Sequence, residues 1–129
     1  CKAVEAAGAD AISLTNTFQA CAIDLEKRRP VFHNIFAGLS GPAVRPIALR
    51  MVWQAVGAVH IPVVGLGGIA TGRDALEFLM AGATAVQVGA ANFSNPRAME
   101  TIAQEMAQWM DAHGVKTLDE IRGCARNAE

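Results

Sequence analysis

Short apolar runs alternate with longer segments in which apolar residues recur every three or four positions. The short runs cover residues 11–14, 62–66 and 85–88, and each is typical of a strand with both faces covered. Helical periodicity follows in residues 43–59 and in about 73–81. Strands that alternate with helices in this way predict a parallel sheet with right-handed crossovers.

Two further helices are predicted near the end of the chain. Asn95 is suited to cap a helix, with Pro96 at its first position. The apolar stripe of that helix would consist of Met99, Ile102, Ala103, Met106 and Met110. Thr117 and Glu120 have the spacing of a capping box, which predicts a short terminal helix. Residues 90–94 are expected to form only a connector.

The first residues look like the end of a helix, because an alanine-rich stretch stops at Gly8. Residues 7–14 also match residues 81–88, each with a helix end, a glycine and then a buried strand. Since no initiator Met is present, we expect this sequence to be the later part of a longer chain. Three strands with about five helical segments fit the C-terminal half of a (β/α)₈ TIM barrel, so residues 1–129 would be a single partial domain. A small doubly wound sheet is the alternative.

A long connection over residues 18–39 interrupts this alternation. It carries a charged stretch at residues 24–29 and then Pro30. Its apolar members, which could form a small hairpin or a covering strand, are Val31, Phe32, Ile35 and Phe36. Because connections longer than about 12 residues are often lids or binding segments, this one is a candidate for function.

Composition narrows the class of protein. Hydrophobic residues make up 52% of the chain and charged residues 18%, which excludes disorder. The net charge of −1 gives no electrostatic case for binding nucleic acid or an anionic membrane, and no apolar run reaches the roughly 20 residues of a membrane span. Cys1, Cys21 and Cys124 lie far apart, as expected of free thiols in a reducing compartment. These features predict a cytoplasmic protein.

Glycines follow two successive predicted strands. Residues 65–68 read Gly-Leu-Gly-Gly, and residues 89–92 read Gly-Ala-Ala-Asn. In a TIM barrel, ligands bind at the carboxyl ends of the strands, and a phosphate commonly binds at the last two. Glycine turns can adopt positive φ and bring backbone N–H groups close to an anion. We therefore predict a phosphate site, although a glycine turn without a ligand is the alternative for either stretch alone.

Thr15, Asn16 and Thr17 follow the first predicted strand and would lie at the same end of the sheet. The amide of Asn16 can donate and accept, so it suits a ring with alternating N–H and C=O groups. An Asx turn that closes the strand is the alternative for Asn16, and ordinary capping is the alternative for Thr17. No nucleophile with a general base is apparent, because the three histidines share no spacing with a partner and Cys21 has no base nearby.

Several segments, taken in order, resemble one family. They are residues 15–17, 22–26, 38–50, 64–69, 74–83 and 86–93. Together they resemble the NAD-linked class 1B dihydroorotate dehydrogenases, over nearly all of the chain. The most specific of them is Gly-Leu-Ser-Gly-Pro with the Arg-Pro-Ile-Ala-Leu-Arg that follows, whereas the glycine turns alone are not specific. The pyrimidine-binding domain of dihydropyrimidine dehydrogenase is the nearest relative to exclude.

The resemblance implies an FMN-dependent TIM barrel that oxidises dihydroorotate to orotate in the synthesis of pyrimidines (UMP). It implies FMN contacts, mostly through backbone atoms, by Thr15, Gly41, Gly67, Gly68, Gly89 and Ala90. Asn16 and Thr17 would bind the pyrimidine. The family usually has Thr at position 90, so Ala90 would lack one hydroxyl contact to the phosphate.

The resemblance also implies partners. Class 1B enzymes pair with an electron-transfer subunit that carries FAD and a 2Fe–2S cluster and delivers electrons to NAD⁺, in a heterotetramer. The family's catalytic cysteine and a flavin-contacting lysine would belong to the N-terminal half of the barrel. Cys1 and Cys21 do not match that cysteine's motif, so no catalytic base is assigned. The alternatives are a non-flavin phosphate-binding lyase or isomerase with the same barrel, and an inactive fragment, since half a barrel is expected to lack dehydrogenase activity.

Overall fold

A parallel sheet of three strands lies at the centre of the computed structural model, which describes residues 1–127. The strands are β1 (Ile12–Leu14), β6 (Val63–Leu66) and β7 (Ala85–Gln87), with β6 in the middle. In register, Ser13 pairs with Val64, and Val64 pairs with Ala85. The three predicted strands and their parallel pairing are confirmed.

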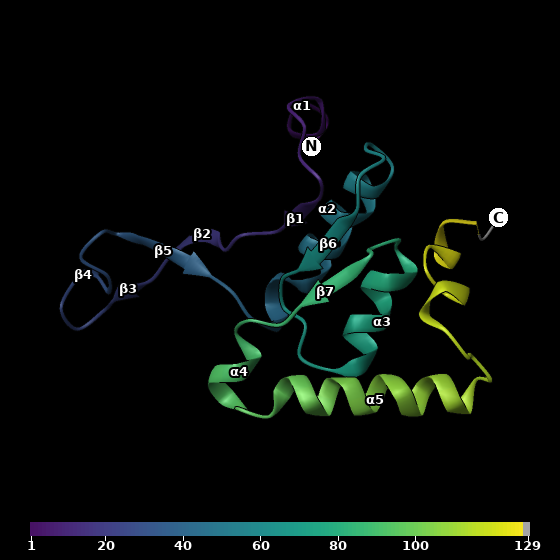
Figure 1. Cartoon of the computed structure of the whole chain (residues 1–129). Coiled ribbons are helices and arrows are strands. Elements are labelled where there is room, and N and C mark those ends of the chain that lie inside the picture. The colour runs from purple at the N-terminus through teal and green to yellow at the C-terminus, as the bar shows by residue number, and fades with distance from the viewer. Residues whose placement is uncertain (128–129) are drawn as a thin grey trace.

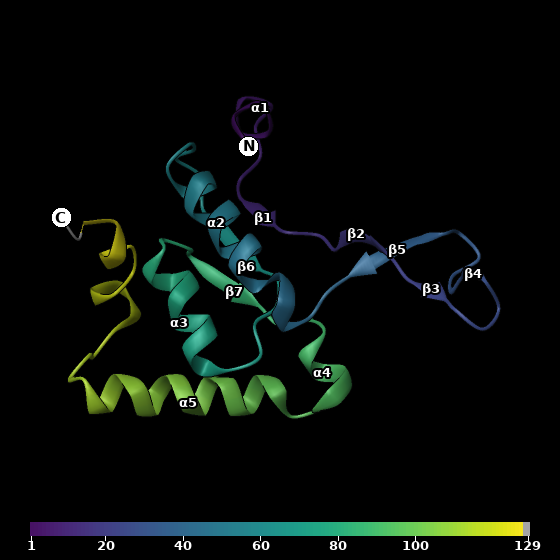
Figure 2. The same ribbon diagram turned by 180° about the vertical axis from the view of Figure 1, so that it is seen from behind.

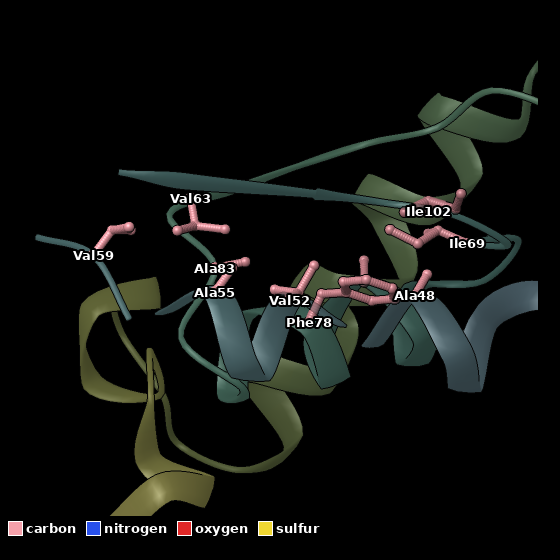
Figure 3. Packing of buried hydrophobic residues seen from close by; sticks show 10 residues of the cluster. Ala48, Val52, Ala55, Val59, Val63, Ile69, Phe78, Ala83 and Ile102 are labelled. Carbon is pink, nitrogen blue, oxygen red and sulfur yellow. The ribbon is translucent and has the colours of Figure 1, made fainter. Parts of the chain in front are cut away.

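Two helices cover one face of this sheet. The first is α2 (Arg45–Val56), which follows the 3-10 turn η1 (Pro42–Val44), and the second is α3 (Gly72–Met80). Figure 3 shows Val63 of the middle strand directed toward the side chains of these helices. The residues of the core cluster are Ala48, Val52, Ala55, Val59, Val63, Ile69, Ala75, Phe78, Ala83 and Ile102. The helical periodicity of both segments is therefore confirmed.

A longer helix, α5 (Ala98–Ala112), runs across the end of α3 (Figure 1). Leu76 and Leu79 of α3 pack against Ile121, which follows the 3-10 turn η2 (Leu118–Glu120). The predicted capping box is present, since Thr117 N donates to Glu120 Oε1 at 2.9 Å. The terminal helical segment η3 (Cys124–Asn127) is also of the 3-10 type.

The chain begins with a short helix, α1 (Lys2–Ala6), as the sequence predicts. Its Glu5 carboxylate accepts hydrogen bonds from His60 N at 2.6 Å and Ile61 N at 3.1 Å, which links α1 to the segment before β6. Gly8 and Gly82 both have positive φ and both lead into a strand, so the two repeated segments share one helix–glycine–strand structure.

A hairpin projects from the sheet, away from the C-terminal segment (Figures 1 and 2). Its strands β2 (Phe18–Cys21) and β5 (Phe36–Leu39) pair antiparallel, and β3 (Ile23–Asp24) pairs with β4 (Arg29–Pro30) beyond them. The prediction of a hairpin is confirmed. Of its apolar residues, Val31, Phe32 and Ile35 lie outside the strands and Phe36 lies in β5, and all four are exposed.

Three local predictions are wrong. Residues 91–94 form the short helix α4 (Ala91–Ser94) rather than a plain connector. Asn95 does not cap α5: it forms an Asx turn in which its Oδ1 accepts from Arg97 N at 3.0 Å, and the helix begins at Ala98, two residues after the predicted Pro96. The edge strands β1 and β7 are not covered on both faces, since Ser13 and Gln87 are exposed on the face without helices. In residues 1–127, no helix is both long and apolar enough to cross a bilayer.

Candidate functional site

One cavity lies at the carboxyl ends of the three parallel strands, with a volume of about 730 Å³. Its walls come from the ends of β1, β6 and β7, from the turn before η1 and from α4. The fold brings together on it all eight residues that the sequence analysis selected, namely Thr15, Asn16, Thr17, Gly41, Gly67, Gly68, Gly89 and Ala90. They come from four separate stretches of the chain, so the fold and not local sequence makes them neighbours.

Thr15 continues the pairing of β1 with β6 into the cavity wall. Its backbone N donates to Leu66 O at 2.8 Å, and its hydroxyl donates to the same carbonyl at 3.4 Å. It is the one buried polar residue of the described chain. The hydrogen bonds to Leu66 and the burial of the side chain together hold Thr15 at a fixed position beside the glycine turn after β6.

Asn16 and Thr17 are exposed on the cavity wall. Asn16 Oδ1 accepts from Thr17 N at 2.7 Å, which fixes the orientation of the amide. This contact reaches the next residue, whereas an Asx turn would reach the second residue along the chain. Within residues 1–127 the Nδ2 group makes no hydrogen bond, so it can donate to a ligand in the cavity.

The turn after β6 packs backbone against backbone. Gly68 has φ of +77°, and a Cβ there would lie 2.6 Å from Gly41 O and 2.8 Å from Arg45 N. Gly67 has φ of +132°, and its Cβ would lie 2.6 Å from the Cβ of Ala48. Both positions therefore require glycine, for conformation and for space. The result is a wall of bare backbone.

A smaller cavity of about 110 Å³ adjoins this wall, with four lining residues in common with the larger one. It is lined by Gly41, Pro42, Gly68, Ile69, Ala70, Gly89, Ala90, Ala91 and Ser94. Ser94 brings the only hydroxyl among them, and no charged side chain lines either cavity. The Ser94 hydroxyl already donates to Ala91 O at 3.1 Å, so an anion in the smaller cavity would be bound mainly by backbone N–H groups, as in many phosphate sites.

The titratable groups with shifted pKa values lie outside both cavities. The His60 N–H lowers the pKa of Glu5, and the Lys27 N–H lowers the pKa of Asp24. A paired hydrogen bond raises the pKa of Arg97 and lowers that of Glu100. Cys21 is exposed in the hairpin, and none of the three histidines lines either of these two cavities. Among the described residues, no three His, Cys, Asp or Glu side chains group as metal ligands.

Seven lining residues of the larger cavity were not given a ligand-binding role from the sequence: Ser13, Leu39, Ser40, Val44, Leu66, Asn92 and Phe93. Asn92 lies in the polar strand-end segment 89–92, but its role depends on α4, which the sequence did not predict. Its Nδ2 donates to Val88 O at 2.9 Å and to Gly89 O at 3.2 Å, and so ties α4 to the end of β7. An Asn four residues after the predicted strand 85–88 is the signal that could have found it.

The sequence of this chain matches a known protein family. The family model described as dihydroorotate dehydrogenase matches residues 1–110. The chain belongs to the dihydroorotate dehydrogenase family. This bears out the family resemblance noted from the sequence.

Curated members of the dihydroorotate dehydrogenase family align with most of this chain. A protein of Trichlorobacter lovleyi is 56% identical over 122 residues, which is 95% of this chain and 40% of that protein. A protein of Geobacter sulfurreducens is 60% identical over 117 residues, 91% of this chain and 38% of its own length. One from Desulforudis audaxviator is 53% identical over 123 residues, 95% of this chain and 40% of the relative. All three are named dihydroorotate dehydrogenase B (NAD⁺), catalytic subunit. The chain thus spans about two fifths of the length of these relatives.

Proposed function

We propose that this chain forms the FMN- and pyrimidine-binding part of an enzyme that oxidises dihydroorotate to orotate in pyrimidine synthesis. One observation carries the proposal: all eight residues that the family resemblance selects line a single cavity at the carboxyl ends of the strands. The names of the relatives, which specify the catalytic subunit of an NAD⁺-linked dihydroorotate dehydrogenase, support it.

The proposed architecture is the C-terminal half of a TIM barrel. Support comes from the parallel order β1-β6-β7, from helices on one face only, and from the share of the relatives that the chain covers. Both outer strands have a free edge within the described chain. The remainder of the barrel would pair with these edges and cover the face on which Ser13 and Gln87 are exposed.

The residues present fit FMN. Gly67 and Gly68 form a wall that any Cβ would disrupt, and the smaller cavity beside it offers backbone donors without an acidic side chain. We assign the phosphate end to Gly68, Gly89 and Ala90, with Thr15 and Gly41 as further FMN contacts. Ala90 contributes no hydroxyl, and the Ser94 hydroxyl in the same small cavity already donates to Ala91 O at 3.1 Å.

Asn16 and Thr17 are the proposed pyrimidine contacts. The unpaired Nδ2 of Asn16 would donate to a ring carbonyl, and its amide orientation is already fixed by Thr17 N. FMN, when bound, supplies the two-electron acceptor that oxidation of dihydroorotate requires. The residues of this chain would hold and orient both molecules, while the general base that removes a proton would come from the rest of the barrel.

The partner is an electron-transfer subunit with FAD and a 2Fe–2S cluster, and the acceptor is NAD⁺. The relatives' names, which pair a catalytic subunit with NAD⁺, support a separate subunit of this kind. The exposed free thiols Cys1, Cys21 and Cys124 support a reducing compartment, and we place the enzyme in the cytoplasm.

The test uses the natural polypeptide that carries residues 1–129, purified under native conditions. We expect bound flavin, identified as FMN after extraction, and bleaching of its visible absorbance by dihydroorotate without oxygen. A colourless protein that retains another phosphate ligand would instead support a lyase or isomerase. Bleaching by dihydrouracil but not by dihydroorotate would support a dihydropyrimidine dehydrogenase-like enzyme. Either result would overturn the proposal.

A further inference from the structure

A network of side chains behind the small cavity joins its two walls. One wall is Gly41 and Pro42, just before α2, and the other is the backbone of residues 68–70, just before α3. Arg45 begins α2, and its Nη1 lies 3.0 Å from Asp74 Oδ1 in the first turn of α3. The guanidinium also pairs with Glu77. Arg45 lines neither cavity, so its effect on a ligand would be indirect.

Asp74 connects this ion pair to the cavity wall. Its other oxygen, Oδ2, accepts from Ala70 N at 3.0 Å and from Thr71 N at 2.9 Å. Thr71 Oγ1 in return accepts from Asp74 N at 3.2 Å, which completes a capping box. Ala70 lines the small cavity, so the carboxylate of Asp74 fixes a peptide plane of the cavity wall directly.

The capping box alone would account for the position of the Asp74 carboxylate, but it does not account for the ion pair that Arg45 makes with it. The glycine turn is closely packed against the start of α2, since a Cβ on Gly68 would lie 2.8 Å from Arg45 N and 2.9 Å from Arg45 Cβ. The Arg45 side chain also pairs with Asp74, whose carboxylate accepts hydrogen bonds from the other end of the same turn. The side chains of Arg45 and Asp74 are 32% and 13% exposed, so this ion pair is partly shielded from water and its attraction is stronger than in bulk solvent.

We propose that Arg45 is a positioning residue, which through Asp74 sets the separation of the two walls of the small cavity and so its fit to the phosphate of FMN. The inference rests on the proposed function. Two carboxylates already face the guanidinium, so Arg45 acts by geometry and not as a free positive charge near the phosphate. Backbone donors bind an oxyanion well only when their spacing is fixed beforehand.

The experiment measures the Kd of FMN and of riboflavin, which lacks the phosphate, in the flavin-free form of the natural polypeptide. Arg45→Met is expected to raise the Kd of FMN about tenfold, because it removes the ion pair that fixes the two walls, and to raise that of riboflavin less than about twofold. Asp74→Asn keeps an oxygen for Ala70 N but loses the ion pair, so it should give a similar loss. Because both substitutions remove the same Arg45–Asp74 ion pair, the double variant should raise the Kd of FMN no more than either single variant does.

Arg50→Met is the matched control, because Arg50 lies on the same helix and bonds only Gln54 among the described residues. It should leave both Kd values unchanged. If Arg45→Met does not fold, Arg45→Lys replaces it, with a smaller loss for FMN expected because the ammonium can still pair with Asp74. Unchanged FMN affinity in the Arg45 and Asp74 variants, or an equal loss for FMN and riboflavin, would overturn the inference. A wild-type protein that does not bind FMN would overturn the proposed function and this inference together.

Discussion

The ring of Phe78 fills the space that a side chain at Gly65 would need. A Cβ on Gly65 would lie 2.6 Å from Phe78 Cδ1. Gly65 is in the middle strand β6, and Phe78 is a fully buried residue of α3. The helix therefore rests on the strand through a contact between ring and backbone, and this contact sets how closely α3 approaches the sheet that carries the cavity.

Gly65→Ala should lower the free energy of unfolding by about 1–3 kcal/mol, because the added methyl overlaps the ring. Phe78→Leu should lower it by about 1–2 kcal/mol, as expected for a smaller side chain in a packed core. The double variant should lose less than the sum, since Leu leaves room for the methyl. Denaturant unfolding measures all three. Gly89→Ala is the control for stability, because a Cβ there meets nothing within 4 Å, and strictly additive losses would contradict the prediction.

Gly68→Ala tests the glycine turn at the cavity. It should destabilise the protein by about 1–3 kcal/mol through its positive φ and should also abolish FMN binding, because the methyl would displace Gly41 or Arg45. Gly114→Ala is matched in φ, at +68°, but its Cβ meets nothing within 4 Å. It should show the loss of stability without the loss of FMN. Equal FMN affinity in the two variants, measured by fluorescence titration, would argue against a phosphate wall at Gly68.

The sequence predicted the elements of the fold well where periodicity is strong. The three strands and the helices α2 and α3 lie within a few residues of their predicted positions, because buried apolar faces leave little choice of register. The sequence could not predict that β1 and β7 are exposed on one face, since an apolar run does not show whether another element of the fold covers both faces of the strand. Met99 illustrates this in α5: it continues the apolar stripe but is 60% exposed.

The candidate site was predictable in position and less so in detail. Polar and glycine residues at strand ends must meet at one edge of a parallel sheet, which is why Thr15, Gly67 and Gly89 could be grouped in advance. The role of Asp74 depends on a side chain that folds back on the preceding turn, and Arg45 reaches it from 29 positions earlier in the chain. The Thr71–Asp74 contact has the local spacing of a capping box, whereas the contact with Arg45 follows from the packing of α2 against α3 and leaves no local pattern.

Asn16→Ala should weaken the binding of orotate to the flavin-loaded natural polypeptide by about tenfold to a hundredfold, because a hydrogen-bonding group in the proposed pyrimidine site is removed. FMN content should not change, since FMN is assigned to other residues. Equilibrium titration of the flavin spectrum with orotate measures the effect. Asn34→Ala, in the exposed segment between β4 and β5, is the control and should leave orotate affinity unchanged. An unchanged affinity in Asn16→Ala would remove Asn16 from the site.

Glu5 should make stability depend on pH in the acid range. The hydrogen bond from His60 N lowers its pKa below the ordinary 4.5, so the folded state favours the carboxylate. A lowered pKa in the folded state gives stability that is present above the unfolded pKa and is lost as the pH falls through the folded pKa.

Glu5→Gln, which cannot be charged, should therefore be less stable than the wild type at neutral pH. The difference should shrink as the pH falls below about 4.5 and the wild-type carboxylate takes up a proton. Thermal unfolding at a series of pH values, at constant ionic strength, measures this difference. Glu26→Gln is the control for removal of a carboxylate, since the Glu26 side chain makes no hydrogen bond within residues 1–127. A difference for Glu5→Gln that grows toward acid pH would mean that the carboxylate does not hold α1 against the segment before β6.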